Sequence, residues 1–236
     1  MIDISTAESR AILKSYGGSL VEPEVFVKNI QEIEPVDPST YCVMFSEKPA
    51  SYCIGVVDMV GSTKLAASLG MLRMSKYYQN FLNLMSKIIE VYDGKVIKNV
   101  GDCLLFYFPH TRTLQDKSEI RKCIECSFAM IDVHEFLCTR MKKEGLPCVD
   151  YRVSIDCGYV IPMRSSDSKA PDMIGPAVNM CSKINRCAEK NGIVVGGDLY
   201  QIASNIEGYH FKENRGFSVG FKQDYPVYLL TRKQNK

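Results

Sequence analysis

The chain has 236 residues, of which 46% are hydrophobic and 24% charged, and its net charge at pH 7 is +2. This composition supplies a hydrophobic core, and the near-neutral charge excludes general affinity for nucleic acid. No apolar run approaches the ~18 residues that span a membrane, so we expect no integral membrane segment. The start of the chain lacks the basic and apolar regions of a secretory signal, and the ten cysteines lack the spacing of a disulfide framework. We therefore expect reduced thiols and a cytoplasmic location.

Apolar periodicity and turn residues divide the chain into alternating strands and helices. The expected strands are 41–45, 52–58, 95–108 (a hairpin), 149–161 with a bulge at Gly158, 193–195, 209–217 and 227–231. The expected helices are 5–16, 64–92 with a break at Gly70, 118–143 capped by Ser118, 176–190, and 198–203 capped by Asp198. This mixture of hairpins and helices predicts an α+β fold with a mixed sheet, and residues 1–50 are expected to form an arm of unknown role.

The first candidate site follows the strand 52–58. An aspartate, Asp58, ends the strand, and the turn Gly61-Ser62-Thr63 leads into the next helix. A carboxylate at the end of a core strand is costly to bury unless it meets a cation, and backbone amides at a helix start bind anions. The pattern therefore suits a metal-bound phosphate. The alternative is an ordinary turn residue at Asp58 and a simple helix cap at Ser62 or Thr63.

The hairpin supplies the second candidate site. Its turn is Gly101-Asp102, and Lys98 precedes the glycine by three residues. Asp102 alone could be a common turn residue. Together, the two stretches resemble the class III nucleotidyl cyclases, a family with a strand ending in Asp-x-x-Gly-[Ser or Phe]-Thr and a later Lys-x-x-Gly-Asp hairpin. The resemblance extends over residues 52–230 and implies a ferredoxin-like cyclase core, with a catalytic domain over 51–236.

A third stretch, 172–184, resembles the family's Gly-x-x-Val-Asn helix. What the resemblance implies is carried over position by position. The implied roles are metal binding by Asp58, Asp102 and the Met59 carbonyl, triphosphate binding by Gly61, Ser62, Thr63 and Lys222, base selection by Lys98 and Asp172, ribose orientation by Asn179, and transition-state charge stabilisation by Lys183. The match at Lys222 is looser, because the usual glycine after the lysine is absent.

The base-selecting pair favours adenine on chemical grounds. Adenine presents an acceptor at N1 and a donor at its 6-amino group, which a lysine and an aspartate complement. Guanine presents the reverse, so Lys98 and Asp172 would face like groups. The alternative is a solvated hairpin lysine and an ordinary loop carboxylate.

The departure from the family pattern is Lys183, where the family usually has arginine. Lysine keeps the positive charge but loses the planar fork that binds two phosphate oxygens at once. Arg186, nearly one turn further on, could reach the site instead, although solvation is its ordinary state. Activity is therefore expected to be reduced.

The resemblance implies an adenylate cyclase, an enzyme that converts ATP to 3′,5′-cyclic AMP and pyrophosphate with two Mg²⁺ or Mn²⁺ ions per site. In this family the metal aspartates of one subunit meet the ribose and base residues of another. One chain here carries both sets, which implies a head-to-tail homodimer. The alternatives are a catalytically weak or inactive nucleotide-binding signalling domain, a guanylate cyclase, and a structural domain without a nucleotide site.

Overall fold

The computed structural model describes residues 41–166, 172–214 and 225–233. The chain divides into two compact units, residues 1–42 and 43–236, and the first lies almost wholly outside the described residues. The expected helix over 5–16 lies there too. The expected division into an arm over 1–50 and a catalytic domain over 51–236 therefore stays a prediction.

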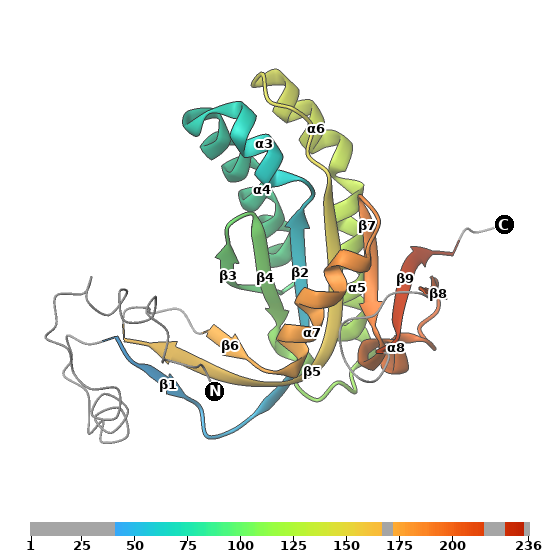
Figure 1. Ribbon diagram of the computed structural model, residues 1–236. Helices are drawn as coiled ribbons and strands as arrows, with labels where there is room; N and C mark the ends of the chain where they lie inside the picture. The colour runs from blue at the N-terminus through green and yellow to red at the C-terminus, as the bar shows by residue number, and fades with distance from the viewer. Residues whose placement is uncertain (1–40, 167–171, 215–224, 234–236) are drawn as a thin grey trace, which may run out of the picture. The chain divides into compact units, whose positions relative to one another are not determined.

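A mixed sheet forms the frame of the second unit (Figure 1). Within the described residues its strands are β1 (Val43–Phe45), β2 (Ala50–Met59), β3 (Lys95–Val100), β4 (Cys103–Phe108), β5 (Tyr151–Ser165), β6 (Asp172–Ile174), β7 (Gly192–Gly196), β8 (Tyr209–Glu213) and β9 (Val227–Arg232). The main order is β3-β4-β2-β5-β7-β9-β8, while β1 and β6 pair with the outer part of β5. The β5–β7 pair is parallel and the other pairs are antiparallel. The expected α+β fold with a largely antiparallel sheet is confirmed.

Helices cover both faces of this sheet. Within the described residues they are α3 (Ser62–Leu69), α4 (Met71–Val91), α5 (Lys117–Asp132), α6 (His134–Lys143), α7 (Pro176–Ile184) and α8 (Gly197–Ala203), with short 3₁₀ turns at Pro109–Thr111 and Asn185–Cys187. In Figure 1, α7 lies on the viewer's side of the sheet, and α4 and α5 lie behind it. None of the described helices is both long and apolar enough to cross a membrane.

The central strand β2 is buried from both sides because its alternate residues enter two cores. Val57 packs with α4 and α5, whereas Ile54 and Val56 pack beneath α7. Gly55 is required between them, since a Cβ at this position would lie 2.1 Å from the ring of Phe106 on the neighbouring strand β4. The sheet therefore holds β2 rigidly, and the residues at its end are placed by core packing.

Several predicted boundaries are wrong. The single helix expected over 118–143 is two helices that meet at Val133. The prediction missed this break because the apolar spacing continues across it. The helix over 176–190 ends as α-helix at Ile184. The expected bulge at Gly158 is absent from the regular β2–β5 register, and an irregularity lies instead in β3 between Val96 and Lys98.

Two predicted helix caps are also wrong. Asp116, rather than Ser118, caps α5, because its carboxylate accepts hydrogen bonds from both the amide and the hydroxyl of Ser118, at 2.8 and 2.7 Å. Asp198 lies inside the first turn of α8, whose N-cap is Gly196.

The expectation of ten reduced cysteines fails at one place. Cys138 of α6 and Cys148, in the segment before β5, are joined by a disulfide. Their side chains meet because the turn after α6 folds the chain back along the helix. Cys123 and Cys126, which have C-x-x-C spacing, are buried thiols in α5, and burial raises both thiol pKa values.

Candidate active site

Asp58 and Asp102 come together through the register of the sheet. The β2–β4 pairing sets Asp58 opposite Cys103, the residue after Asp102, so the end of β2 and the β3–β4 turn share one edge. Burial, together with the negative charge of Asp102, raises the pKa of Asp58 to about 6, against the opposing effect of Arg152 and Arg186. The same surroundings raise the pKa of the Cys103 thiol to about 12.

This carboxylate pair fits a divalent cation. The neighbouring charge of Asp102 disfavours ionisation of the partly buried Asp58 carboxyl, and a cation bound there would remove that penalty. Carboxylate and carbonyl oxygens are the ligands that hard ions such as Mg²⁺ and Mn²⁺ prefer. The Met59 side chain is buried in the core, so a contribution of this residue to metal binding would have to come from its backbone carbonyl.

The turn after β2 begins a helix without a side-chain cap. Gly61 is the N-cap of α3 in the left-handed conformation, at φ 73°, and it makes no side-chain cap hydrogen bond. The alternative of a cap at Ser62 or Thr63 is therefore wrong, because both lie within the first turn. A helix start without a side-chain cap leaves amide groups available for an anion, and this one begins three residues after Asp58.

Lys98 and Asp172 are brought together from positions 74 residues apart. The Lys98 ammonium lies 2.5 Å from Oδ2 of Asp172, and the Asp172 Oδ1 atom accepts a hydrogen bond of 2.7 Å from the Met173 amide. Lys98 lies on β3, and Asp172 begins β6, a three-residue strand that pairs with the outer part of β5. The exposed fractions of the two side chains are 43% and 25%, so the pair remains open to a ligand.

Asn179 and Lys183 lie one turn apart on α7 and face away from the sheet. The helix buries Ala177, Cys181 and Ile184 in the opposite direction, and both polar side chains are exposed. This amphipathic pattern positions them on an outer surface of the chain. Lys222, predicted to bind triphosphate, lies outside the described residues.

Two residues beside the candidate site, Arg152 and Asn185, were not predicted from the sequence, and Arg186 was considered only as an alternative to Lys183. Arg152 lies opposite Asp58 in the β2–β5 register, and its buried Nε has no hydrogen-bond partner among the described residues. The positive charge of Arg186 lowers the pKa of Asp58. Asn185 is buried and donates to the Val56 carbonyl at 3.3 Å, which fixes the end of α7 to β2. Strand register would have identified Arg152, but register is not visible in the sequence.

The comparison with protein families identifies the family of this fold. Residues 44–232 match the model of the adenylate and guanylate cyclase catalytic domain. The chain belongs to this family. The two aspartates at the sheet edge, the helix start after β2 and the outer face of α7 are therefore parts of a class III cyclase domain.

Individual relatives of this cyclase domain are distant. A cytidylate cyclase of Staphylococcus aureus is 24% identical over 84% of this chain and 48% of its own length. Adenylate cyclase 2 of Rhizobium meliloti (strain 1021) is 26% identical over 55% of this chain and 37% of its own length. The chain thus spans about half the length, or less, of these curated relatives.

A solved structure shows the same fold. The adenylyl cyclase CyaB from P. aeruginosa superimposes with a TM-score of 0.70 at 22% identity, over 79% of this chain and 96% of that one. The cyclase architecture is therefore shared, although the sequences have diverged widely.

Proposed function

We propose that this domain is an adenylate cyclase, which converts ATP to 3′,5′-cyclic AMP and pyrophosphate at a homodimer interface. The observation that carries the proposal is the contact between Lys98 and Asp172, the two residues expected to select the base, in a chain that also has the two aspartates expected to bind metal. Membership of the cyclase family supports the reaction type, and the chemistry of the pair supports the substrate.

The mechanism assigns each group a binding or orienting task. The amides of the Gly61–Thr63 turn would bind the triphosphate, together with Lys222, and Asn179 would orient the ribose. Lys183 would stabilise the charge that develops on the α-phosphate as the ribose 3′-hydroxyl attacks in line and pyrophosphate leaves. Positioning and electrostatics thus supply most of the rate, without a dedicated protein base.

Asp58, Asp102 and the Met59 carbonyl would hold two Mg²⁺ or Mn²⁺ ions. When bound, these ions would lower the pKa of the 3′-hydroxyl and offset the charge of the phosphates. The raised pKa of Asp58 supports this assignment, because a carboxyl buried beside another carboxylate is poised to accept a cation.

A head-to-tail homodimer would complete the site. Asn179 and Lys183 face outward on α7, so their substrate contacts are suited to a second subunit. Large apolar side chains are also exposed on the strands that carry or flank the site, with Tyr159 of β5 at 70% and Val100 of β3 at 62% exposure. Such residues on a folded domain are typical of a surface that another chain covers.

A second candidate substrate is CTP. Cytosine presents a ring-nitrogen acceptor beside an exocyclic amino donor, the same pattern as adenine. The Lys98–Asp172 pair therefore separates amino bases from keto bases and leaves purine and pyrimidine to the size of the site. The similarity to a cytidylate cyclase over 84% of the chain favours this candidate specifically.

The test is product formation by the purified chain with ATP, CTP, GTP and UTP in turn, in the presence of Mn²⁺. We expect cyclic AMP as the main product and loss of activity in Asp58→Ala. The preference over GTP should be about 10-fold or more, because each unsatisfied polar contact costs ~1–3 kcal/mol.

Each other outcome changes the assignment. Preference for CTP would select the second candidate, and preference for GTP would show that Lys98 and Asp172 do not read the base. No product from any triphosphate, with a folded dimer and bound nucleotide, would replace turnover by a nucleotide-binding signalling role.

A further inference from the structure

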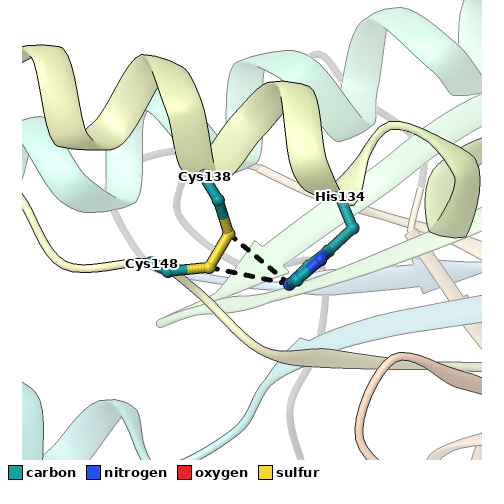
Figure 2. Close-up of side chains that lie close together, drawn as sticks. All are labelled: His134, Cys138 and Cys148. Carbon is teal, nitrogen blue, oxygen red and sulfur yellow. Dashed lines mark hydrogen bonds between the residues drawn. A yellow bond between two sulfur atoms is a disulfide. The ribbon is translucent and has the colours of Figure 1, made fainter.

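A cluster of sulfur and imidazole ligands lies apart from the cyclase residues. His134 and Cys138 are one turn apart on α6, and Cys148 reaches them from the segment between α6 and β5. Figure 2 shows both sulfur atoms facing one ring nitrogen of His134. That atom, Nε2, lies 3.5 Å from the Cys138 sulfur and 3.7 Å from the Cys148 sulfur.

These distances are those of a metal-ligand set. In a tetrahedral zinc site, Zn–S bonds of ≈ 2.3 Å and Zn–N bonds of ≈ 2.0–2.1 Å separate sulfur from nitrogen by about 3.6 Å. Both sulfur-to-nitrogen distances therefore fit one ion. Only the two sulfurs must separate, because they are bonded to each other as a disulfide.

We propose that His134, Cys138 and Cys148 form a second metal site, which takes one Zn²⁺-class ion when the cysteines are reduced and is closed by the disulfide when they are oxidised. Thiolate and imidazole ligands suit this class of borderline-soft ion and disfavour Mg²⁺. The site therefore differs in chemistry from the oxygen-lined pair Asp58 and Asp102.

The conversion between the two forms balances with a dithiol as the reductant. The Cys138–Cys148 bond breaks and receives two electrons, while the two thiols of the reductant become a disulfide. The protein gains two thiols, which lose their protons to solvent as the metal binds. His134 would then hold its ring hydrogen on Nδ1, since Nε2, which lies 3.0 Å from the Val149 carbonyl, becomes a ligand.

The cluster is accessible but built into the fold. Cys148 is exposed, so a reductant and a metal can reach it, while Cys138 is buried and fixes the position of the pair. Three protein ligands leave the fourth position to water. The Asp150 carboxylate, whose Oδ1 lies 3.7 Å from Nε2, accepts hydrogen bonds from Lys190 and Asn191. It places a negative charge beside the cluster.

The position of the cluster connects it to the cyclase site. The segment that begins at Cys148 continues into Asp150, whose carbonyl accepts a 2.8 Å hydrogen bond from the Val60 amide. Val60 lies two residues after Asp58. Binding at the cluster would therefore fix the segment that supports the turn after β2.

The experiment measures zinc uptake by the full chain, and it does not depend on cyclase activity. The protein is reduced with a dithiol, freed of reductant under anaerobic conditions, and titrated with Zn²⁺ against a chromophoric chelator. Co²⁺ serves as a second probe, because thiolate ligands give it a characteristic charge-transfer absorption. The variants are Cys148→Ser and His134→Gln, with Cys42→Ser as a control that removes a partly exposed thiol outside the cluster.

We expect one equivalent of tightly bound zinc in the reduced wild type and in Cys42→Ser, and none after oxidation. Each cluster variant should bind at least ~100-fold more weakly, since even outer-shell changes cost ~10–100-fold. Asp58→Ala should bind zinc at the cluster like the wild type. Equal zinc affinity in Cys148→Ser and the wild type, or no uptake by the reduced wild type, would overturn the proposal and leave the pair as a disulfide alone.

Discussion

Asp58 meets two opposing demands. The proposed cation binding would require a charged carboxylate at the end of β2, whereas burial and the neighbouring Asp102 disfavour that charge and raise the Asp58 pKa from 3.8 to about 6. The folded chain therefore retains a proton that the unfolded chain releases. Because of this difference, folding stability falls as the pH rises from about 4 to about 6, and the loss persists at higher pH. The site costs stability in the absence of metal.

Asp58→Asn should accordingly be more stable than the wild type at pH 8 without metal, although we expect it to be inactive. The pKa shift, discounted for the partial exposure of the carboxyl, corresponds to about 1 kcal/mol. Urea unfolding at pH 4 and pH 8 with a chelator measures the difference, which should nearly vanish at pH 4. Asp93→Asn is a control for which we expect the opposite change, a loss of stability at pH 8, because an ion pair of 2.8 Å with Lys122 lowers the Asp93 pKa. Equal stability of wild type and Asp58→Asn at pH 8 would mean that ionised Asp58 carries no penalty.

Lys183 provides a second prediction at this scale. Lys183→Arg should raise kcat by up to ~10-fold, because a planar guanidinium can bind two phosphate oxygens, while Lys183→Ala should lower kcat by ~10²–10³. Steady-state kinetics with ATP and Mn²⁺ measures both. The control is Lys87→Arg, the same change in an exposed pair with Glu90 on α4. If kcat were unchanged by both substitutions, another residue would have to supply the positive charge that stabilises the α-phosphate, and Arg186 would be the first position to examine.

At the level of elements, the sequence predicted what local chemistry determines. The strand that carries Asp58, the Gly101–Asp102 hairpin turn and the break at Gly70 depend on apolar spacing and turn residues, and the structure confirms all three, although the strand runs over Ala50–Met59. β6 was missed because three residues in a charged loop carry no periodicity. The Cys138–Cys148 pair was missed because it depends on how α6 packs against the following segment. Tertiary placement of this kind leaves no pattern in the sequence.

The turn that begins α3 gives a prediction about backbone conformation. A Cβ at Gly61 would meet nothing within 4 Å, so Gly61→Ala introduces strain at a φ of 73° without a clash. The expected cost in stability is about 1 kcal/mol. The larger effect should be on KM for ATP, since relaxation of the strain would turn the amides away from the triphosphate. Gly61→Asn is the control, because asparagine tolerates this conformation better.

Thermal unfolding and steady-state kinetics together test this reasoning. We expect KM for ATP to follow the order wild type, Gly61→Asn, Gly61→Ala, from lowest to highest. A KM for Gly61→Ala equal to that of the wild type, with the stability loss present, would remove the triphosphate from this turn.

For the whole molecule, the arrangement of the two residue sets is the central question. One set, Asp58 and Asp102, lies at the edge of the sheet, and the other, Asn179 and Lys183, lies on the outer face of α7. Each chain carries both sets, so a two-fold dimer in which they meet between subunits has two equivalent sites. A site within one chain would instead make dimerisation unnecessary for activity.

Mixing two inactive variants separates these arrangements. Asp58→Ala removes the metal side of the site and Asn179→Ala removes the ribose side, so each homodimer should be inactive. In a mixed dimer, one site receives both defects and the other receives neither. Half of the dimers in an equal, fully exchanged mixture are mixed, so the activity should recover to about one quarter of the wild-type value. The control mixes Asp58→Ala with Asp102→Ala, which damage the same side and cannot complement each other. If the first mixture stayed as inactive as this control, with exchange confirmed by tagged subunits, both residue sets would act within one chain.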